Sequence, residues 1–265
     1  MHAPDPGMRR ITAFLSGFAR RQAERTVAVP GGFAALDDTF HASRADNQVV
    51  IDDPAAVDPA ALAGIADAAL GHLPFRLVSV LDDEGGAACA PSMVRAGYAH
   101  LPLVVLRHTG PPPPAAGPGE PAAGEVEAAA FREPLARRWR GFLPDVGDEV
   151  LRQLVDRRRA RLRGAETVRF LGARTPGGDV AAWADLYLDP ASGTAQIEDL
   201  MTAADRLGRG YGDAVLAAGL RAAAEAGCAT RFLTADEADW PRHWYERRGF
   251  APVGRVHVFE RDQSL

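Results

Sequence analysis

A run of prolines, glycines and alanines near the middle of the chain, GPPPPAAGPGEPAAG at 110–124, most limits how these 265 residues can fold. Successive prolines favour an extended polyproline conformation, and no residue in the run is large enough to anchor a core. We therefore expect a linker at 110–124, between an N-terminal domain at 1–109 and a C-terminal domain at 125–265. Each half is long enough to form a core of its own.

The N-terminal half predicts a mixed layer of strands and helices. β-branched residues and apolar spacing indicate strands at 27–29, 49–51, 75–81 and 101–106, and helices at 59–70 and 90–97. No glycine-rich loop that could bind an anion occurs among these elements. We therefore do not expect this half to hold a phosphate-bearing ligand.

The C-terminal half has a sharper pattern. We expect a helix at 148–162, strands at 167–173, 180–188 and 194–201, and a second helix at 213–226. Asp189-Pro190-Ala191-Ser192-Gly193 between the last two strands is typical of a β-hairpin with a longer loop. The arginine-rich stretch at 157–163 lies on the first helical pattern and is expected to form a solvated face.

The loop between the last strand and the last helix contains Gly208, Gly210 and Gly212. A loop of this kind presents unpaired backbone N–H groups at the positive end of a helix dipole. The glycines let that backbone approach a phosphate closely, and Arg209 adds a positive charge at the rim. A Walker-type loop requires a lysine, and the chain contains none. A dinucleotide-binding loop follows the first strand of a parallel unit, whereas this loop follows a hairpin.

Three segments resemble motifs of the GCN5-related N-acetyltransferase (GNAT) superfamily and occur in the family order over about residues 148–262. The loop at 207–212 is similar to the family's Arg/Gln-x-x-Gly-x-Gly/Ala loop, although Leu207 stands where Arg or Gln is usual. Residues 196–201 resemble the strand before that loop, and residues 244–250 resemble the Leu-Tyr-x-x-x-Gly-Phe motif.

The resemblance implies an α/β fold with a mixed α+β sheet, the GNAT fold, in which the C-terminal copy is catalytic. The strand order of the N-terminal half is compatible with a second, degenerate GNAT-like copy. Its Val94-Arg95-Ala96-Gly97-Tyr98 resembles the end of the third motif. Because this copy lacks a glycine loop, it is not expected to bind acetyl-CoA.

The resemblance also implies which residues bind acetyl-CoA, the expected cosubstrate. A backbone N–H near the end of the strand is expected to meet the thioester carbonyl as an oxyanion contact. The residues expected to hold the cosubstrate are Leu200, Met201, Thr202, Leu207, Gly208, Arg209, Gly210, Tyr211 and Gly212.

Acetyl transfer to an amine also needs a base and an acid. Glu198 stands where many relatives place the carboxylate that takes the amine proton, and Tyr245 is the candidate acid that protonates the departing thiolate. Period-two alternation puts Glu198 and Asp199 on opposite faces of the strand, which favours Glu198, with Asp199 as the alternative base. Glu198 could instead pair with an arginine or bind substrate, and Tyr245 could instead be a packing residue.

The reaction implied is transfer of an acetyl group from acetyl-CoA to a primary amine of a small molecule or peptide. Two alternatives stay open. One is a catalytically silent acyl-CoA-binding module, which needs neither Glu198 nor Tyr245. The other is a tandem thiol-conjugate synthase of the mycothiol type, which acetylates the cysteinyl amine of a thiol precursor.

Composition excludes other classes of partner. The formal charge of −5 argues against nucleic acid as a partner. It leads us to expect that acidic residues, in a pocket partly formed by the groove between the domains, attract a cationic amine. The two cysteines and the scattered histidines predict neither a disulfide framework nor a metal site, and they suit a cytoplasmic protein. No run approaches the roughly 18 apolar residues of a membrane span. We expect a monomer or homodimer.

Overall fold

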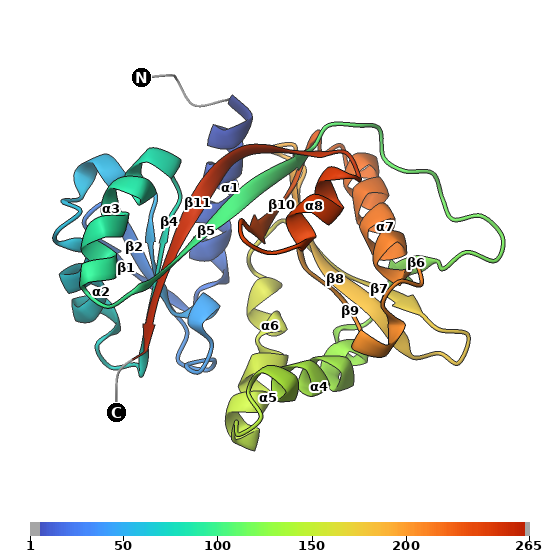
Figure 1. The fold of residues 1–265 in the computed structure, drawn as a ribbon, viewed down its shortest axis with the longest axis horizontal. Helices are drawn as coiled ribbons and strands as arrows, with labels where there is room; N and C mark the ends of the chain where they lie inside the picture. Colours follow the sequence, from blue (N-terminus) through green and yellow to red (C-terminus); the bar gives the residue numbers. More distant parts are fainter. Residues whose placement is uncertain (1–5, 263–265) are drawn as a thin grey trace. The chain divides into compact units, whose positions relative to one another are not determined.

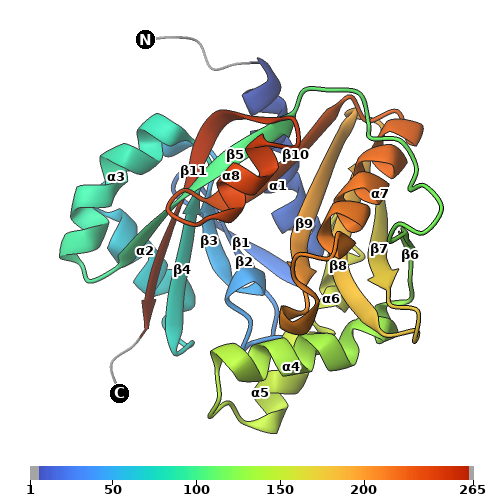
Figure 2. The same ribbon diagram turned by 45° about the vertical axis from the view of Figure 1, so that its right-hand side comes forward.

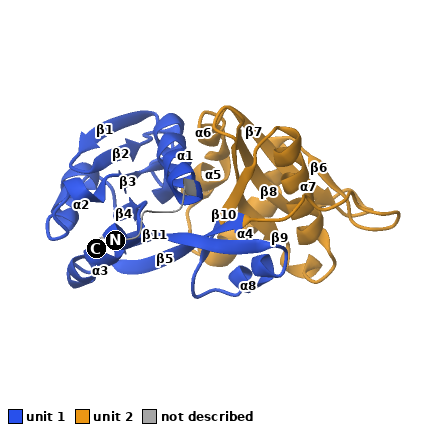
Figure 3. Ribbon diagram, turned by 90° about the horizontal axis from the view of Figure 1, so that it is seen from above, with its two compact units in different colours: residues 1–107, 234–265 blue, residues 108–233 orange. Residues whose placement is uncertain are grey.

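The computed structural model describes residues 6–262 and divides into two compact units (Figures 1 and 3). The first unit comprises residues 1–107 and 234–265, and the second comprises residues 108–233. This grouping differs from the division predicted from the sequence, because residues 234–262 are grouped with residues of the N-terminal half in the first unit. Among the described residues, no helix is both long and apolar enough to cross a membrane.

The first unit contains a mixed sheet in the order β1-β2-β3-β4-β11-β5. Its elements are α1 (Pro6–Gln22), β1 (Arg25–Val29), β2 (Gly32–Leu36), β3 (Gln48–Ile51), α2 (Leu62–Leu70), β4 (Phe75–Val80), α3 (Asp83–Arg95), β5 (Ala99–His108), α8 (Pro241–Glu246) and β11 (Phe250–Asp262). β1, β2 and β3 pair in antiparallel fashion, and α2 then connects β3 to the parallel strand β4. The four strands predicted in this half are confirmed, whereas α1 and β2 were not predicted.

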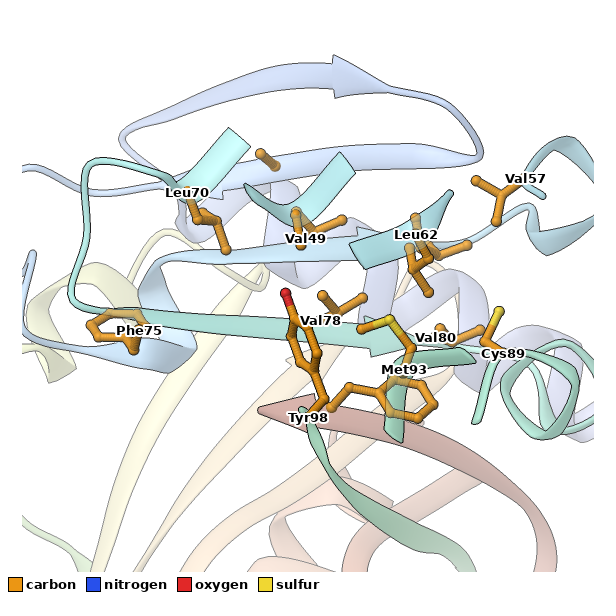
Figure 4. Packing of buried hydrophobic residues seen from close by; sticks show 14 of the residues in the cluster. Val49, Val57, Leu62, Leu70, Phe75, Val78, Val80, Cys89, Met93 and Tyr98 are labelled. Atoms are coloured by element: carbon orange, nitrogen blue, oxygen red, sulfur yellow. The ribbon is translucent and has the colours of Figure 1, made fainter. Parts of the chain in front are cut away.

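Apolar side chains of α2 and α3 pack against β3 and β4 to form the core of the first unit (Figure 4). Leu62, Ala66 and Leu70 lie on one stripe of α2 because they are four residues apart, and all three are fully buried. Burying each of the two leucines contributes roughly 1.5–3 kcal/mol. Phe259 of β11 belongs to the same cluster, opposite Val78 of β4.

β11 pairs with β4 in antiparallel fashion, from His257 opposite Val80 to Asp262 opposite Phe75. The buried His257 ring lies between two polar neighbours. Its Nε2 is 3.1 Å from Asp83 Oδ1, and its Nδ1 is 2.9 Å from His100 Nε2. β11 lies between β4 and β5 in the sheet, so it is an internal strand of the first unit.

The second unit contains strands in the order β10-β9-β8-β7-β6. Its elements are β6 (Ala123–Glu125), α4 (Arg132–Phe142), α5 (Asp148–Asp156), α6 (Arg158–Arg161), β7 (Thr167–Arg174), β8 (Val180–Asp189), β9 (Thr194–Thr202), α7 (Tyr211–Glu225) and β10 (Thr230–Asp236). The predicted helix at 148–162 is interrupted at Arg157, and α4 was not predicted. The predicted hairpin between β8 and β9 is confirmed.

Helices cover both faces of the strands in the second unit. α7 lies along β7, β8 and β9 (Figure 2), where Gly219 fits closely against Ile197 and Leu171. On the opposite face, α4 and α5 pack against Phe170 and Trp183. Residues 109–122 form neither helix nor strand, whereas Ala123 and Gly124 at the end of the predicted linker belong to β6. The Pro114 carbonyl accepts a hydrogen bond from Arg221 of α7.

The chain repeats one order of elements. β1-β2-β3-α2-β4-α3-β5 and β7-β8-β9-α7-β10-α8-β11 each begin with three antiparallel strands and continue with a helix and a parallel strand. The last helix of each run is followed by a glycine in the left-handed region and an aromatic residue. These are Gly97 (φ 85°) before Tyr98, and Gly249 (φ 84°) before Phe250. The resemblance of residues 94–98 to the end of the third motif is therefore matched by a repeat in the structure.

Candidate active site

The connection between β9 and α7 has the geometry of an anion site. Gly208 (φ 71°) and Gly210 (φ 81°) adopt left-handed backbone conformations that side chains rarely adopt. No side chain caps α7 at Gly210. The first N–H groups of a helix have no acceptor within the helix itself. A Cβ at Gly208 would have no atom within 4 Å, so the space beside the loop is open. The connection can therefore take a phosphate or diphosphate.

Two predicted loop residues lie at the surface. Leu207, which stands where the motif has Arg or Gln, is 58% exposed. The neighbouring Arg206 forms an ion pair with Asp205 at 3.1 Å. Arg209 is exposed as well, at the rim of the loop. The departure from the motif at Leu207 thus lies at an exposed position of the loop.

Only the first part of β9 is paired on both edges. It pairs in parallel with β10 from Thr194 opposite Thr230 to Gln196 opposite Phe232, and it then continues to Thr202. Its other edge stays paired with β8, up to Thr202 opposite Ala182. Residues 197–202 therefore lie beyond the segment of β9 that pairs with β10. The resemblance implies a strand whose end splays in this way.

A β-bulge lies in this part of β9. Glu198 pairs with Asp185 and Met201 pairs with Trp183, so Asp199 and Leu200 together oppose one residue of β8. Asp199 (φ 49°) is the one residue other than glycine in 6–262 with a positive φ. Such backbone strain is common at functional sites.

The bulge corrects the predicted alternation of side chains. Arg161 Nη1 donates to Asp199 Oδ2 at 2.8 Å and also to Asp185, which pairs opposite Glu198 and shares its face. The prediction that Asp199 and Glu198 point to opposite faces is therefore wrong. The extra residue of the bulge shifts the register by one and brings both carboxylates to the same face of β9.

Two buried arginines surround Asp185, which has no exposed surface. Arg158 Nε donates to Asp185 Oδ1 at 2.9 Å, Arg161 pairs with the other carboxylate oxygen, and the Tyr187 hydroxyl donates to that oxygen at 3.1 Å. Burial of an unpaired carboxylate is costly, so these partners are needed. The prediction that residues 157–163 form a solvated face is wrong for Arg157, Arg158 and Arg161, which are buried. The signal in the sequence was an aspartate inside the apolar strand 180–188.

Glu198 and Asp199 have opposite electrostatic environments. Burial, followed by the charge of Asp199, raises the pKa of Glu198 to about 7, against the opposing charge of Arg161. Gln196 Nε2 donates to Glu198 Oε2 at 2.6 Å. For Asp199, burial also opposes ionisation, but Arg161, Arg158 and Arg157 outweigh it and hold its pKa well below the usual range. At neutral pH Asp199 is therefore a fixed carboxylate, whereas Glu198 can take up and release a proton.

Two cavities lie beside the C-terminal end of β9, which runs from Asp199 to Thr202. The larger, about 510 Å³, is lined by α4, by Trp183 and by residues 202–205. The smaller, about 110 Å³, is lined by Asp199, by Met201 and by side chains of α4, α5 and α6. Of the residues predicted to hold the cosubstrate, Thr202 lines the larger cavity and Met201 lines the smaller one.

Tyr245 lies in α8 and therefore belongs to the first unit, whereas Glu198 and the glycine loop belong to the second. Its side chain is buried, and its ring makes edge contacts with Trp244 and Phe250, with centroid distances of 5.1 and 5.7 Å. Its role as the acid beside Glu198 stays a prediction. Across the part of the chain that the structure describes, no group of three His, Cys, Asp or Glu side chains could hold a metal ion.

Comparisons with known proteins agree with the fold. Residues 133–250 match the model of the acetyltransferase (GNAT) family. A GCN5-related N-acetyltransferase from Kribbella flavida superposes with a TM-score of 0.60 at 20% identity, over 97% of this chain and 96% of that chain. An acetyltransferase of the GNAT family from Novosphingobium aromaticivorans gives 0.54 at 19% identity, over 95% and 97%.

A tandem GNAT protein from the clavulanic acid biosynthesis pathway gives a TM-score of 0.53 at 15% identity, over 77% of this chain and 69% of that chain. At such identities the likeness to solved structures shows the fold alone. The tandem protein fits the repeated order of elements described above. No curated protein matches the sequence.

Proposed function

Because residues 133–250 of this chain are a domain of the acetyltransferase (GNAT) family, we propose that the chain transfers an acetyl group from acetyl-CoA to a primary amine of a small molecule or peptide. The observation that carries the proposal is the uncapped N-terminus of α7 behind a loop with two left-handed glycines. Such a loop offers backbone N–H groups and a positive dipole to a diphosphate. Acetyl-CoA, when bound, supplies the activated acetyl group.

In this proposal the backbone of residues 207–212 binds the diphosphate, and the free edge of β9 at residues 200–202 binds the pantetheine arm. A backbone N–H of the bulged segment stabilises negative charge on the carbonyl oxygen. This role suits the bulge, because it turns the backbone away from regular pairing with β8.

Glu198 acts as the base in this proposal. A pKa of about 7 suits a residue that must take a proton from an ammonium group or from a water at neutral pH. Asp199 stays ionised and supports that pKa by its charge. Tyr245 donates a proton to the thiolate that departs.

Two measurements test the proposal. Titration calorimetry with coenzyme A should show association, and thiol release from acetyl-CoA should depend on an added amine. The amines should include peptides, aminoglycosides and a cysteinyl thiol precursor, because the last of these tests the thiol-conjugate alternative. Association without turnover of any amine would favour a silent acyl-CoA-binding module, and absence of association would refute the proposal.

A further inference from the structure

The small cavity beside Asp199 is rich in arginine. Arg138, Arg157 and Arg158 line its 110 Å³, and Asp199 is the one carboxylate that does so. That carboxylate is already bonded to Arg161 at 2.8 Å, and Arg158 Nη2 lies 3.6 Å from it. The residues that line the cavity therefore carry more positive than negative charge, although Arg158 is also bonded to Asp185 at 2.9 Å.

Two buried N–H donors around the cavities have no acceptor. Within residues 6–262, neither Arg158 Nη2 nor Trp183 Nε1 has a hydrogen-bond partner. Arg158 lines the small cavity, and Trp183 lines the adjacent cavity of about 510 Å³. A buried donor without an acceptor costs roughly 1–3 kcal/mol and is rare in native proteins. Arg158 Nη2 lies at ion-pair distance from Asp199 without forming a hydrogen bond to it, so Arg158 keeps unused hydrogen-bonding capacity beside the small cavity.

Arg138 links the two cavities, because it lines both of them together with Phe142. Its guanidinium lies over the Phe142 ring, 4.4 Å from the centroid. Other arginines of α4 have carboxylate partners: Arg137 pairs with Glu133, and Arg140 pairs with Asp148 at 3.5 Å. In the described part of the chain, no carboxylate forms an ion pair with Arg138. Burial lowers the pKa of Arg138 while the charge of Asp199 acts to raise it, and its side chain lines both cavities.

We propose that the acceptor is an amine that carries a carboxylate a few bonds away, and that Arg138 and Arg158 bind this carboxylate while the amine lies near Glu198. The inference rests on the proposed function and specifies its substrate class. Guanidinium groups bind carboxylates through paired N–H donors in a planar fork. A space of 110 Å³ holds roughly four water-sized groups, which suits a carboxylate and a short stem.

This inference reverses the expectation from net charge, which favoured acidic residues that attract a cationic amine. Asp199 does face the cavity, but it is held by two arginines and has no free charge to offer. Specificity then comes from the anion of the acceptor, because an acceptor without it leaves Arg138 without a carboxylate partner.

The test compares straight-chain amino acids with the amides of the same length as acceptors. We expect kcat/KM to be at least about tenfold higher for the acid, which corresponds to about 1.4 kcal/mol. An aminoalkyl phosphonate series distinguishes a phosphate-like group from a carboxylate. A preference for the phosphonate, or equal rates for acid and amide, would overturn the inference while leaving the proposed function intact.

Arg138→Met removes the cation from an exposed position, so the variant is expected to fold. It should raise KM for the acid about tenfold, lower the acid-to-amide discrimination, and leave KM for acetyl-CoA unchanged. Arg140→Met on the same helix is the matched control and should behave like the parent chain. A rise in KM for acetyl-CoA instead would assign Arg138 to the cosubstrate and refute the inference.

Binding of the acetylated acid and the acetylated amide gives a readout that does not need turnover. Calorimetry should show tighter binding of the acetylated acid to the parent chain, and this difference should be lost in Arg138→Met. If no amine is acetylated by the parent chain, the proposed function fails. If the acetylated acid and amide bind equally, the carboxylate site fails whether or not turnover is seen.

Discussion

The two repeated runs of elements differ most where a strand crosses over to the helix. After β9 the chain passes through Gly208 and Gly210 and leaves the N-terminus of α7 uncapped. After β3 the corresponding connection, residues 52–61, contains no glycine and three aspartates. Asp52 accepts hydrogen bonds from Ser16 at 2.5 Å and from Arg20 at 2.9 Å, both on α1. The same topology thus carries in one run the glycine loop that we propose binds an anion, and in the other a connection that is bonded to α1.

The strands before these connections also differ. β9 carries the bulge at Asp199, whereas β3 pairs in regular register with β2 and β4. Four residues before the left-handed glycine of the last helix, the second run has Tyr245 and the first run has Met93. Met93 is fully buried in the core shown in Figure 4. The glycine loop, the bulge and Tyr245, to which we assign proposed roles, thus occur in the second run, whereas the first run has a connection without glycine, regular pairing and a buried methionine at these points.

The largest expected effect comes from making the second connection resemble the first. Gly210→Asp places a negative charge at the loop and a side chain at a φ of 81°. We expect coenzyme A affinity to fall at least about 100-fold by calorimetry, because the carboxylate repels the diphosphate. Gly178→Asp is the control, since Gly178 (φ 92°) has the same strain in open space on another loop of the same unit. Equal losses in both variants would contradict the assignment.

Glu198→Gln removes the carboxylate that precedes the bulge. In the parent chain kcat should rise with pH through about 7, because the base must lose its proton before it can act. We expect the variant to lose roughly 10²–10⁴-fold in kcat and to lose that rise, with coenzyme A affinity unchanged. If the variant kept the pH profile of the parent, the titrating group would be a different residue.

Tyr245→Phe brings the second run closer to the first, which has an apolar methionine at this point. We expect kcat to fall roughly 10- to 100-fold in steady-state assays, because the departing thiolate loses its proton donor. Affinity for coenzyme A should not change. A variant as active as the parent would make Tyr245 a packing residue like Met93.

The smallest expected effect is on stability. The pKa of Glu198 is raised from 4.5 to about 7, so the folded chain binds this proton more tightly than the unfolded chain does. Stability is therefore lost as pH rises from about 4.5 to 7. Glu198→Gln should stabilise the chain at pH 8 by up to about 3 kcal/mol and have little effect at pH 4. Urea unfolding at the two pH values checks this, and equal differences would contradict the raised pKa.

Local patterns predicted much of the fold and the loop. The strands rich in valine and the helix 213–226 were visible because their periodicity is local. β2 was not, because Gly-Phe-Ala-Ala-Leu has little β-branched content and is a strand through its pairing with β1 and β3. The glycine loop could be predicted for the same reason as the strands rich in valine, because its conformation depends on residues that are consecutive in the sequence.

Features that depend on contacts between distant residues could not be predicted from the sequence. The face of Asp199 depends on a bulge that appears only when β9 is aligned with β8. The burial of Arg158 and Arg161 depends on Asp185, which lies in a later strand. The arginine cavity could not be predicted from the net charge, because that number averages over the whole surface.

The pairing of β11 with β4 has a consequence for how the chain is made. Until residues 250–262 leave the ribosome, β4 lacks its neighbour on that side, and its unpaired backbone is open to other strands. The N-terminal unit therefore cannot complete its sheet during synthesis of the segment 108–233. The sheet of the first unit therefore needs residues 250–262, so truncation of the chain before β11 should yield a product prone to misassembly.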